Sequence, residues 1–232
     1  MKNAQAVFVK QLRDIVKNKA VLLQYLVMPV MALALTQLVA KPSGGAIPVT
    51  MFVSMFAAIF VGMVLPAATT GAIAEDRERG SLRFLVMAGV RPGDYLLGVG
   101  GVIFATGAVV LVAFGLMGGL TPLQFARFLG VTLSAAAASV LLGAVVGLLA
   151  GNQQAATAIV MPVSLIFGFG PMVAMFNDVT AKILAPFYTM QMSSMISDIE
   201  APMGKPELII LANIAVLMAL FVLAYKKRGL RA

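Results

Sequence analysis

The sequence predicts an all-α integral membrane protein with six transmembrane helices. Of its 232 residues, 61% are hydrophobic and only 11% are charged, which is a composition typical of membrane proteins. Six mostly apolar stretches are each long enough, at about 20 residues, to cross a bilayer as a helix. Because hydrocarbon offers no partners to backbone polar groups, helices are the expected spanning structure. We expect residues 1–232 to form a single transmembrane domain.

The first 19 residues precede these stretches and have the pattern of an amphipathic helix. Apolar Phe8, Leu12 and Ile15 follow a helical spacing, and charged residues fall on the opposite face. We expect segment 1–19 to be an interface helix on the cytoplasmic surface, with these three side chains toward the membrane. It is either a plain basic anchor or a helix that also contacts a cytoplasmic partner. The segment is too charged for a signal peptide, so we expect the next stretch to be retained.

Six apolar stretches follow, and each is expected to form a transmembrane helix. They cover residues 21–39, 50–72, 95–117, 128–150, 155–176 and 207–225. Only Gly-Asn-Gln-Gln separates the fourth from the fifth, which predicts a tight antiparallel pair. The fourth also repeats a small residue every four positions, at Ala135, Ser139, Gly143, Gly147 and Gly151. Such a stripe lets helices approach closely, either within one subunit or across a dimer.

The basic residues predict the orientation in the membrane. Only four of the 17 Lys and Arg residues would lie on one side: Lys41, Arg127, Lys182 and Lys205. Because cytoplasmic flanks are rich in Lys and Arg, both termini and segment 73–94 are predicted to be cytoplasmic. The same placement explains the net charge of +8 without nucleic-acid binding. The absence of Cys and of N-glycosylation sites fits the inner (plasma) membrane of a bacterium.

On the other side of the membrane, segment 177–206 is long and apolar. An apolar loop is not expected to extend into water. It is therefore predicted to form one or two short helices that re-enter the outer leaflet or cap the outer mouth before the sixth span. A structured loop without a gating role is the alternative.

The residue types that the chain lacks disfavour several kinds of chemistry. Without His or Cys, a zinc, haem or thiol redox site is not expected. No charged residue falls in the central part of a span, although ion-coupled carriers depend on such residues. The phosphate-binding loop Gly-x4-Gly-Lys-Ser/Thr is missing. The chain is therefore predicted not to be an enzyme, to have no catalytic, cofactor or metal site, and to need a partner for any ATP hydrolysis.

Segment 75–91, between the second and third spans, concentrates charge in an otherwise apolar chain. Its charged cluster consists of Glu75, Asp76, Arg77, Glu78, Arg79 and Arg83. As a helix continuing the second span, it would carry Glu75, Arg79 and Arg83 along one stripe, with Glu75 and Arg79 as a favourable pair. Gly80 is expected to let the helix bend. The pattern predicts a short, bent, two-faced helix in the cytoplasm. A solvated charged loop that serves only the orientation in the membrane is the alternative.

This segment also resembles a loop of a known family. The string Glu78-Arg79-Gly80-Ser81-Leu82-Arg83-Phe84-Leu85, then Ala88-Gly89-Val90 and a turn, is similar to the loop of type-2 ATP-binding-cassette (ABC) exporter permeases. The chain length, the six spans, the amino-terminal helix and the apolar excursion before the sixth span are similar as well. Two residues depart from the family pattern: Arg83 stands where an acidic residue is common, and Val99 where a lysine is common.

The resemblance implies the membrane permease subunit of an ATP-driven exporter. Two copies, or one copy and a paralogue, would form the pathway in the lipid membrane, and separate ABC ATPase subunits would bind ATP and Mg²⁺. In that family the loop is a coupling helix, which implies ATPase-coupling roles for Glu75, Glu78, Arg79, Gly80, Ser81, Leu82 and Leu85. The apolar, Met-rich spans favour a hydrophobic or amphipathic substrate such as a drug, peptide or lipid.

Three alternatives stay open at this point. One is a permease of the haem-export or cytochrome-maturation type, and another is a non-transporting immunity or scaffold protein. The third is an ion-coupled carrier, which the missing intramembrane charge disfavours.

Overall fold

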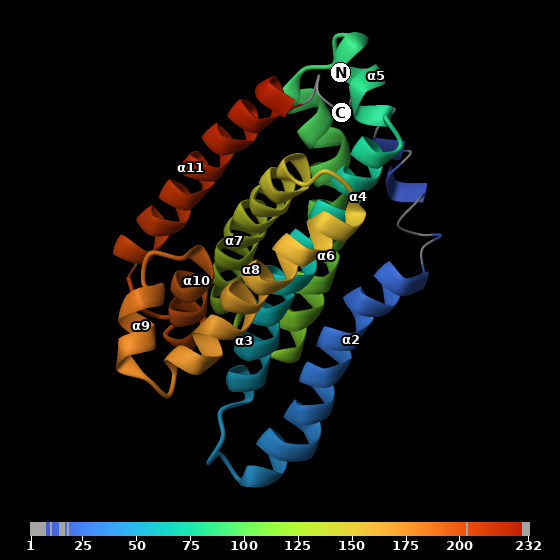
Figure 1. Cartoon of the computed structure of the whole chain (residues 1–232). Helices are drawn as coiled ribbons and strands as arrows, with labels where there is room; N and C mark the ends of the chain where they lie inside the picture. The colour runs from blue at the N-terminus through green and yellow to red at the C-terminus, as the bar shows by residue number, and fades with distance from the viewer. Residues whose placement is uncertain (1–7, 10, 14–16, 18, 203, 229–232) are drawn as a thin grey trace.

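The computed structural model describes residues 8–9, 11–13, 17, 19–202 and 204–228, and every regular element within them is a helix. Among these residues, six helices are long and apolar enough to cross a membrane: Val21–Ser43, Thr50–Glu78, Pro92–Met117, Pro122–Leu149, Gln153–Ala174 and Lys205–Lys227. The helices pack into one elongated bundle (Figure 1). The predicted all-α fold with six spans is therefore confirmed. The second of these helices continues to Glu78, beyond its predicted end at residue 72.

The first two spans each contain a wide π-helical turn directly before a proline. In the first, α2 (Lys19–Leu35) continues through η1 (Thr36–Ala40) into η2 (Lys41–Ser43). In the second, α3 (Val49–Ile59) continues through η3 (Phe60–Val64) into α4 (Leu65–Glu78). The residue before the proline, Lys41 or Leu65, donates its backbone N–H to the carbonyl five positions earlier. In the second span the wide turn lets the helix pass Pro66, which has no N–H, without breaking, whereas the first helix ends at Ser43, directly after Pro42.

The centre of the bundle is α7 (Pro122–Leu149). It packs against α4, α6 (Pro92–Met117), α10 (Tyr188–Ser197) and α11 (Lys205–Arg228). Gly143 and Gly147 of α7 face α4 so closely that a Cβ on Gly143 would lie 2.4 Å from the Pro66 carbonyl oxygen. At these two positions the small-residue stripe therefore serves packing within the chain.

The helix that follows α7 does not form the predicted tight pair with it. A turn at 150–152 reverses the chain into α8 (Gln153–Ala174), but α8 packs chiefly along α3, η3 and α4. The reason is a close crossing between two glycines. A Cβ on Gly62 of η3 would lie 2.4 Å from the Phe167 carbonyl oxygen, and Gly168 faces Met63. Because the glycines have no side chains at this crossing, α8 can pack closely against the second span.

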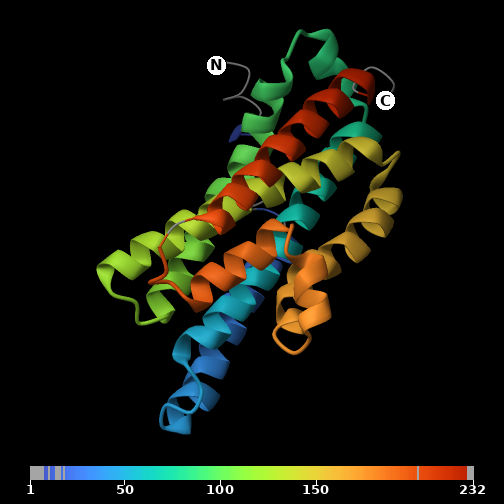
Figure 2. The ribbon, with the colours of Figure 1, turned by 90° about the vertical axis from the view of Figure 1, so that its left-hand side faces the viewer.

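Segment 177–206 contains two short helices, α9 (Asp178–Leu184) and α10, at the end of the bundle opposite α5 (Ser81–Met87) (Figures 1 and 2). α10 is packed among α3, α7, α8 and α11. Its Tyr188 is fully buried, accepts a hydrogen bond from Ser139 of α7 (2.9 Å) and stacks on Phe167 of α8 (5.1 Å between ring centres). These contacts fix α10 inside the bundle.

Tyr188 allows a graded test of how α10 is held. Replacing Tyr188 with Phe removes one buried hydrogen bond and is expected to lower the free energy of unfolding by about 1 kcal/mol. Replacing it with Ala also removes the ring and leaves a cavity, so a loss of roughly 3–5 kcal/mol is expected. Unfolding of the purified protein in detergent measures both. Equal losses for the two variants would contradict a packing role for the ring.

Candidate functional site

The charged segment forms two helices separated by a sharp bend. α4 ends at Glu78, and Gly80 then adopts a left-handed conformation (φ 70°) before α5 begins at Ser81. Such a φ suits glycine because a Cβ is strained there. A second left-handed glycine, Gly89, reverses the chain toward α6, whose first residue is Pro92. The bend predicted at Gly80 is therefore present, and it sets α5 apart from the second span.

α5 has one buried and one exposed face. Leu82 is fully buried, and Leu85 packs against the core. On the exposed face, Phe84 is 70% exposed and Met87 is 58% exposed, and Arg83 is exposed as well. Of the residues expected to couple to a partner, the two leucines thus hold α5 onto the bundle. Phe84 and Met87, which were not singled out from the sequence, are the apolar side chains that a partner can reach.

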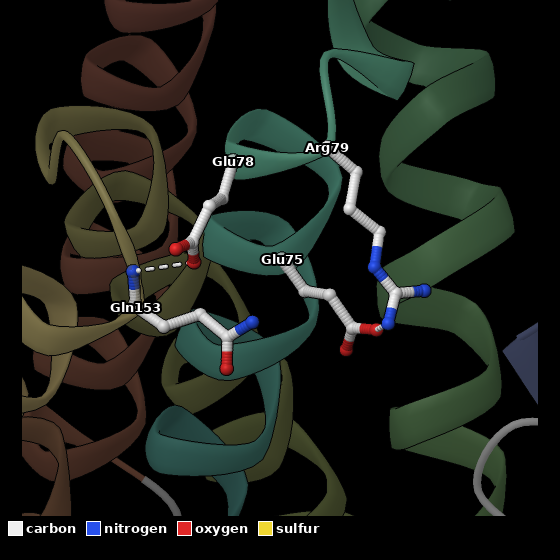
Figure 3. A network of polar contacts seen from close by, with 4 residues as sticks. All are labelled: Glu75, Glu78, Arg79 and Gln153. Atoms are coloured by element: carbon white, nitrogen blue, oxygen red, sulfur yellow. Dashed lines mark hydrogen bonds and ion pairs between the residues drawn. The ribbon is translucent and has the colours of Figure 1, made fainter.

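The exposed charges before the bend bind close neighbours (Figure 3). Arg79 forms the predicted ion pair with Glu75, at 2.8 Å. Glu78 turns to the other side and accepts a hydrogen bond from the backbone N–H of Gln153, the first residue of α8 (3.2 Å). The predicted stripe of Glu75, Arg79 and Arg83 is wrong as a continuous feature, because the chain bends at Gly80 before Arg83 is reached.

Two charged residues of the cluster, Asp76 and Arg77, are buried instead of solvated. They are only 5% and 9% exposed. Asp76 accepts a hydrogen bond from the hydroxyl of Tyr95 in α6 (3.1 Å). Arg77 donates to the carbonyl oxygens of Leu148 and Ala150, at the end of α7. Sequence reasoning missed both residues because it gave neither of them a buried position. The available signal was their spacing, three and four positions after Ile73, which continues the buried face of the second span.

The last part of the segment is held by α11. The hydroxyl of Tyr225 donates to the carbonyl oxygen of Val90 (3.0 Å), and its ring lies 5.7 Å from that of Tyr95. Together with the bonds of Asp76, Arg77 and Glu78, this contact ties the segment to α6, α7, α8 and α11. The site is therefore a short helix on a well-anchored base.

The amino-terminal residues lie beside this site, as far as they are described. Phe8 is half-buried and packs near Gly101 of α6, whereas Leu12 is exposed. Ile15 lies outside the described residues. Gln11 is buried and lines a cavity of about 350 Å³. Other polar residues that line this cavity are Gln24, Thr70, Glu75, Gln153 and Thr157.

These observations define a class of protein. Among the described residues, no group of three or more acidic side chains could hold a metal ion. In the same part of the chain, the six apolar helices carry no charged residue at their centres, and one end of the bundle presents a short, exposed helix. This arrangement suits a multi-pass membrane protein with a short helix accessible to a partner.

A family model described as "ABC-2 family transporter protein" matches residues 12–225, so the chain belongs to this family. The protein is a membrane permease subunit of an ABC transporter, and members of this family are transport subunits without catalytic activity of their own. A comparison with curated proteins found no match. The matched region includes the first five spans, the charged segment and all but the last two residues of the sixth span, and it favours a transport subunit over a scaffold.

Proposed function

We propose that the chain is the permease of an ATP-driven exporter, that it acts as a homodimer or with a paralogue, and that separate ABC ATPase subunits dock on α5. The exposed apolar pair Phe84 and Met87 carries this proposal, because exposed aromatic and Met side chains are typical of protein contacts. The chain has no phosphate-binding loop, so ATP and Mg²⁺ would bind to the partner. Membership of the family also implies association with such an ATPase.

In this proposal the α5 end of the bundle lies in the cytoplasm of a bacterial cell, beneath the inner membrane. Exposed Lys226 and Lys227, at the end of α11, support this orientation because α11 ends close to α5 (Figure 1). Both termini would then be cytoplasmic, and α9 and α10 would lie on the outer side.

The cavity beside Glu75 supports an amphipathic substrate. Its walls combine apolar side chains of α2, α4 and α8 with amide, hydroxyl and carboxylate groups. A site of this kind can bury an apolar body while it pairs a few polar groups. A hydrophobic or amphipathic drug, peptide or lipid is therefore the proposed substrate class.

The proposal is tested by purifying the permease from its native membrane and identifying the ATPase that accompanies it. We expect the ATPase to hydrolyse ATP faster with the permease than alone. Recovery of the permease without any ATPase, under conditions that preserve membrane complexes, would contradict the proposal.

One substitution tests the docking surface directly. Phe84→Ser is expected to weaken ATPase binding by about 2 kcal/mol, or roughly thirtyfold in Kd, because exposed aromatic residues often dominate an interface. Phe176→Ser is the matched control, since Phe176 is 80% exposed but follows α8 at the opposite end of the bundle. Titration of the ATPase onto each purified variant gives the two constants. Equal affinities for both variants would place the docking surface elsewhere.

A further inference from the structure

We propose that Arg77 and Glu78 form a clamp on the turn between α7 and α8, so that the charged segment and this turn move as one body. A displacement of α5 would then also displace the end of α7 and the start of α8. This inference rests on the proposed function, because it assumes that a partner moves α5. It also gives Glu78 a role inside the permease instead of a contact with the ATPase.

The first part of the clamp is the guanidinium of Arg77. It donates to the carbonyl oxygens of Leu148 and Ala150, which lie at the end of α7. The last carbonyls of a helix have no partner within the helix, and they carry its negative dipole end. A buried cation satisfies both requirements at once. Arg77 of α4 thus serves as the C-terminal cap of a helix that lies far away in the sequence.

The second part is the carboxylate of Glu78. It accepts the backbone N–H of Gln153, which is the first N–H of α8 and belongs to the positive dipole end of that helix. Two adjacent residues of α4 therefore hold the end of one helix and the start of the next. Each side chain carries the charge that the helix end requires.

Small residues keep α4 and the turn in direct contact. Ala74 of α4, Ala150 of the turn and Ala156 of α8 form a buried cluster. Deeper in the bundle, a Cβ on Gly147 would lie 2.9 Å from the Cβ of Ile73. With no long side chains between the two surfaces, little movement of the turn relative to α4 is expected.

From the turn, α8 leads to the opposite end of the bundle. Near its far end the ring of Phe167 stacks on that of Tyr188, and a Cβ on Gly170 would meet the Leu184 side chain at 2.7 Å. A displacement applied at Gln153 would therefore reach α9 and α10 through a single packed helix. The clamp supplies the link between α5 and the opposite end.

The experiment uses the absence of Cys and Trp from the chain. All variants carry Phe176→Trp as the fluorescent reporter just after α8, and each is assembled with the ATPase that co-purifies with the permease. Gln153→Cys keeps the backbone N–H and hence the hydrogen bond, whereas Glu78→Cys removes it. The double variant is measured both reduced and bridged by a short bifunctional thiol reagent. The readout is the change in tryptophan emission that ATP causes, after subtraction of the signal from a complex in which Phe176 is retained.

Gln153→Cys sets the reference response to ATP, because it keeps the backbone N–H and hence the hydrogen bond to Glu78. The response of Glu78→Cys and of the reduced double variant should fall to roughly half, because α8 loses its hydrogen bond to α4 while Arg77 still holds the end of α7. Bridging the double variant should restore the response, and ATPase affinity should be the same throughout. Two results would overturn the clamp. One is a Glu78→Cys variant whose tryptophan emission changes with ATP as much as that of the parent. The other is a bridged variant that binds the ATPase but shows no change in emission.

Failure of the proposed function gives a different result. In that case the tryptophan emission of the parent complex would not change with ATP. The clamp is then tested by hydrogen exchange in the purified permease without the ATPase. Glu78→Cys should then speed the exchange of the Gln153 amide hydrogen with deuterated water about tenfold, and bridging should reverse this. Unchanged exchange would overturn the clamp independently of any ATPase.

Discussion

Gly143→Ala is expected to lower the free energy of unfolding by about 3 kcal/mol or more, although it adds a single methyl group. The new Cβ would lie 2.4 Å from the Pro66 carbonyl oxygen and 2.8 Å from the Cβ of Thr69. The nearest of these atoms is backbone, which cannot rotate away as the end of a side chain can. Helices α4 and α7 must therefore separate, and this would loosen the central contact of the bundle.

Gly71→Ala is the matched control for this effect. Gly71 lies in the middle of α4, and a Cβ there would meet nothing within 4 Å. Because Ala is the better helix former, this variant should be stabilised by roughly 0.5–1 kcal/mol. Reversible unfolding of both variants in the same detergent provides the comparison. A Gly143→Ala protein as stable as the parent would show that the α4–α7 crossing has room for a methyl group.

Arg77→Met should be the most damaging substitution within the charged segment, at roughly 3–5 kcal/mol. It leaves the carbonyl oxygens of Leu148 and Ala150 without their donor and removes a buried cation next to Asp76 in the chain. Methionine fills a similar volume, so the loss would reflect the polar contacts rather than an empty space.

Arg79→Met is the control, and it lies only two positions away. The Arg79 side chain is 69% exposed, and it pairs with Glu75, one turn earlier in the same helix. Exposed pairs of this kind contribute only about 0.3–0.5 kcal/mol, so little change in stability is expected. Thermal unfolding of the two variants distinguishes the buried arginine from the exposed one. Equal stability of the two proteins would mean that Arg77 is solvated.

Much of the fold could be predicted because membrane insertion depends on local sequence. A stretch of about 20 apolar residues is stable in the membrane as a helix whatever packs against it. The six spans can therefore be predicted from composition alone. The bend at Gly80 is also a local property, since it depends on the φ angle that one glycine can adopt. The pair of Glu75 and Arg79 follows from their spacing on one helix turn.

The candidate site was predicted less completely. The sequence pattern did not distinguish Asp76 and Arg77 from the other charges of the cluster, but both are buried by α6 and α7. The two acceptors of Arg77 lie 71 and 73 positions away in the sequence. Likewise, Leu82 is buried while Phe84 and Met87 are exposed, because the bend at Gly80 sets which face of α5 meets the bundle.

The sequence by itself determined that this protein is an all-α membrane protein with six spans and one charged segment between the second and third of them. Only the tertiary structure decided which charges in that segment are exposed, that α8 packs on the second span, and that Arg77 and Glu78 hold the turn after α7. The physical reason is the range of the interactions. The length of an apolar stretch and the φ angle of a glycine depend only on residues that are close in the sequence. The burial of a charge depends instead on backbone groups that distant helices bring to it.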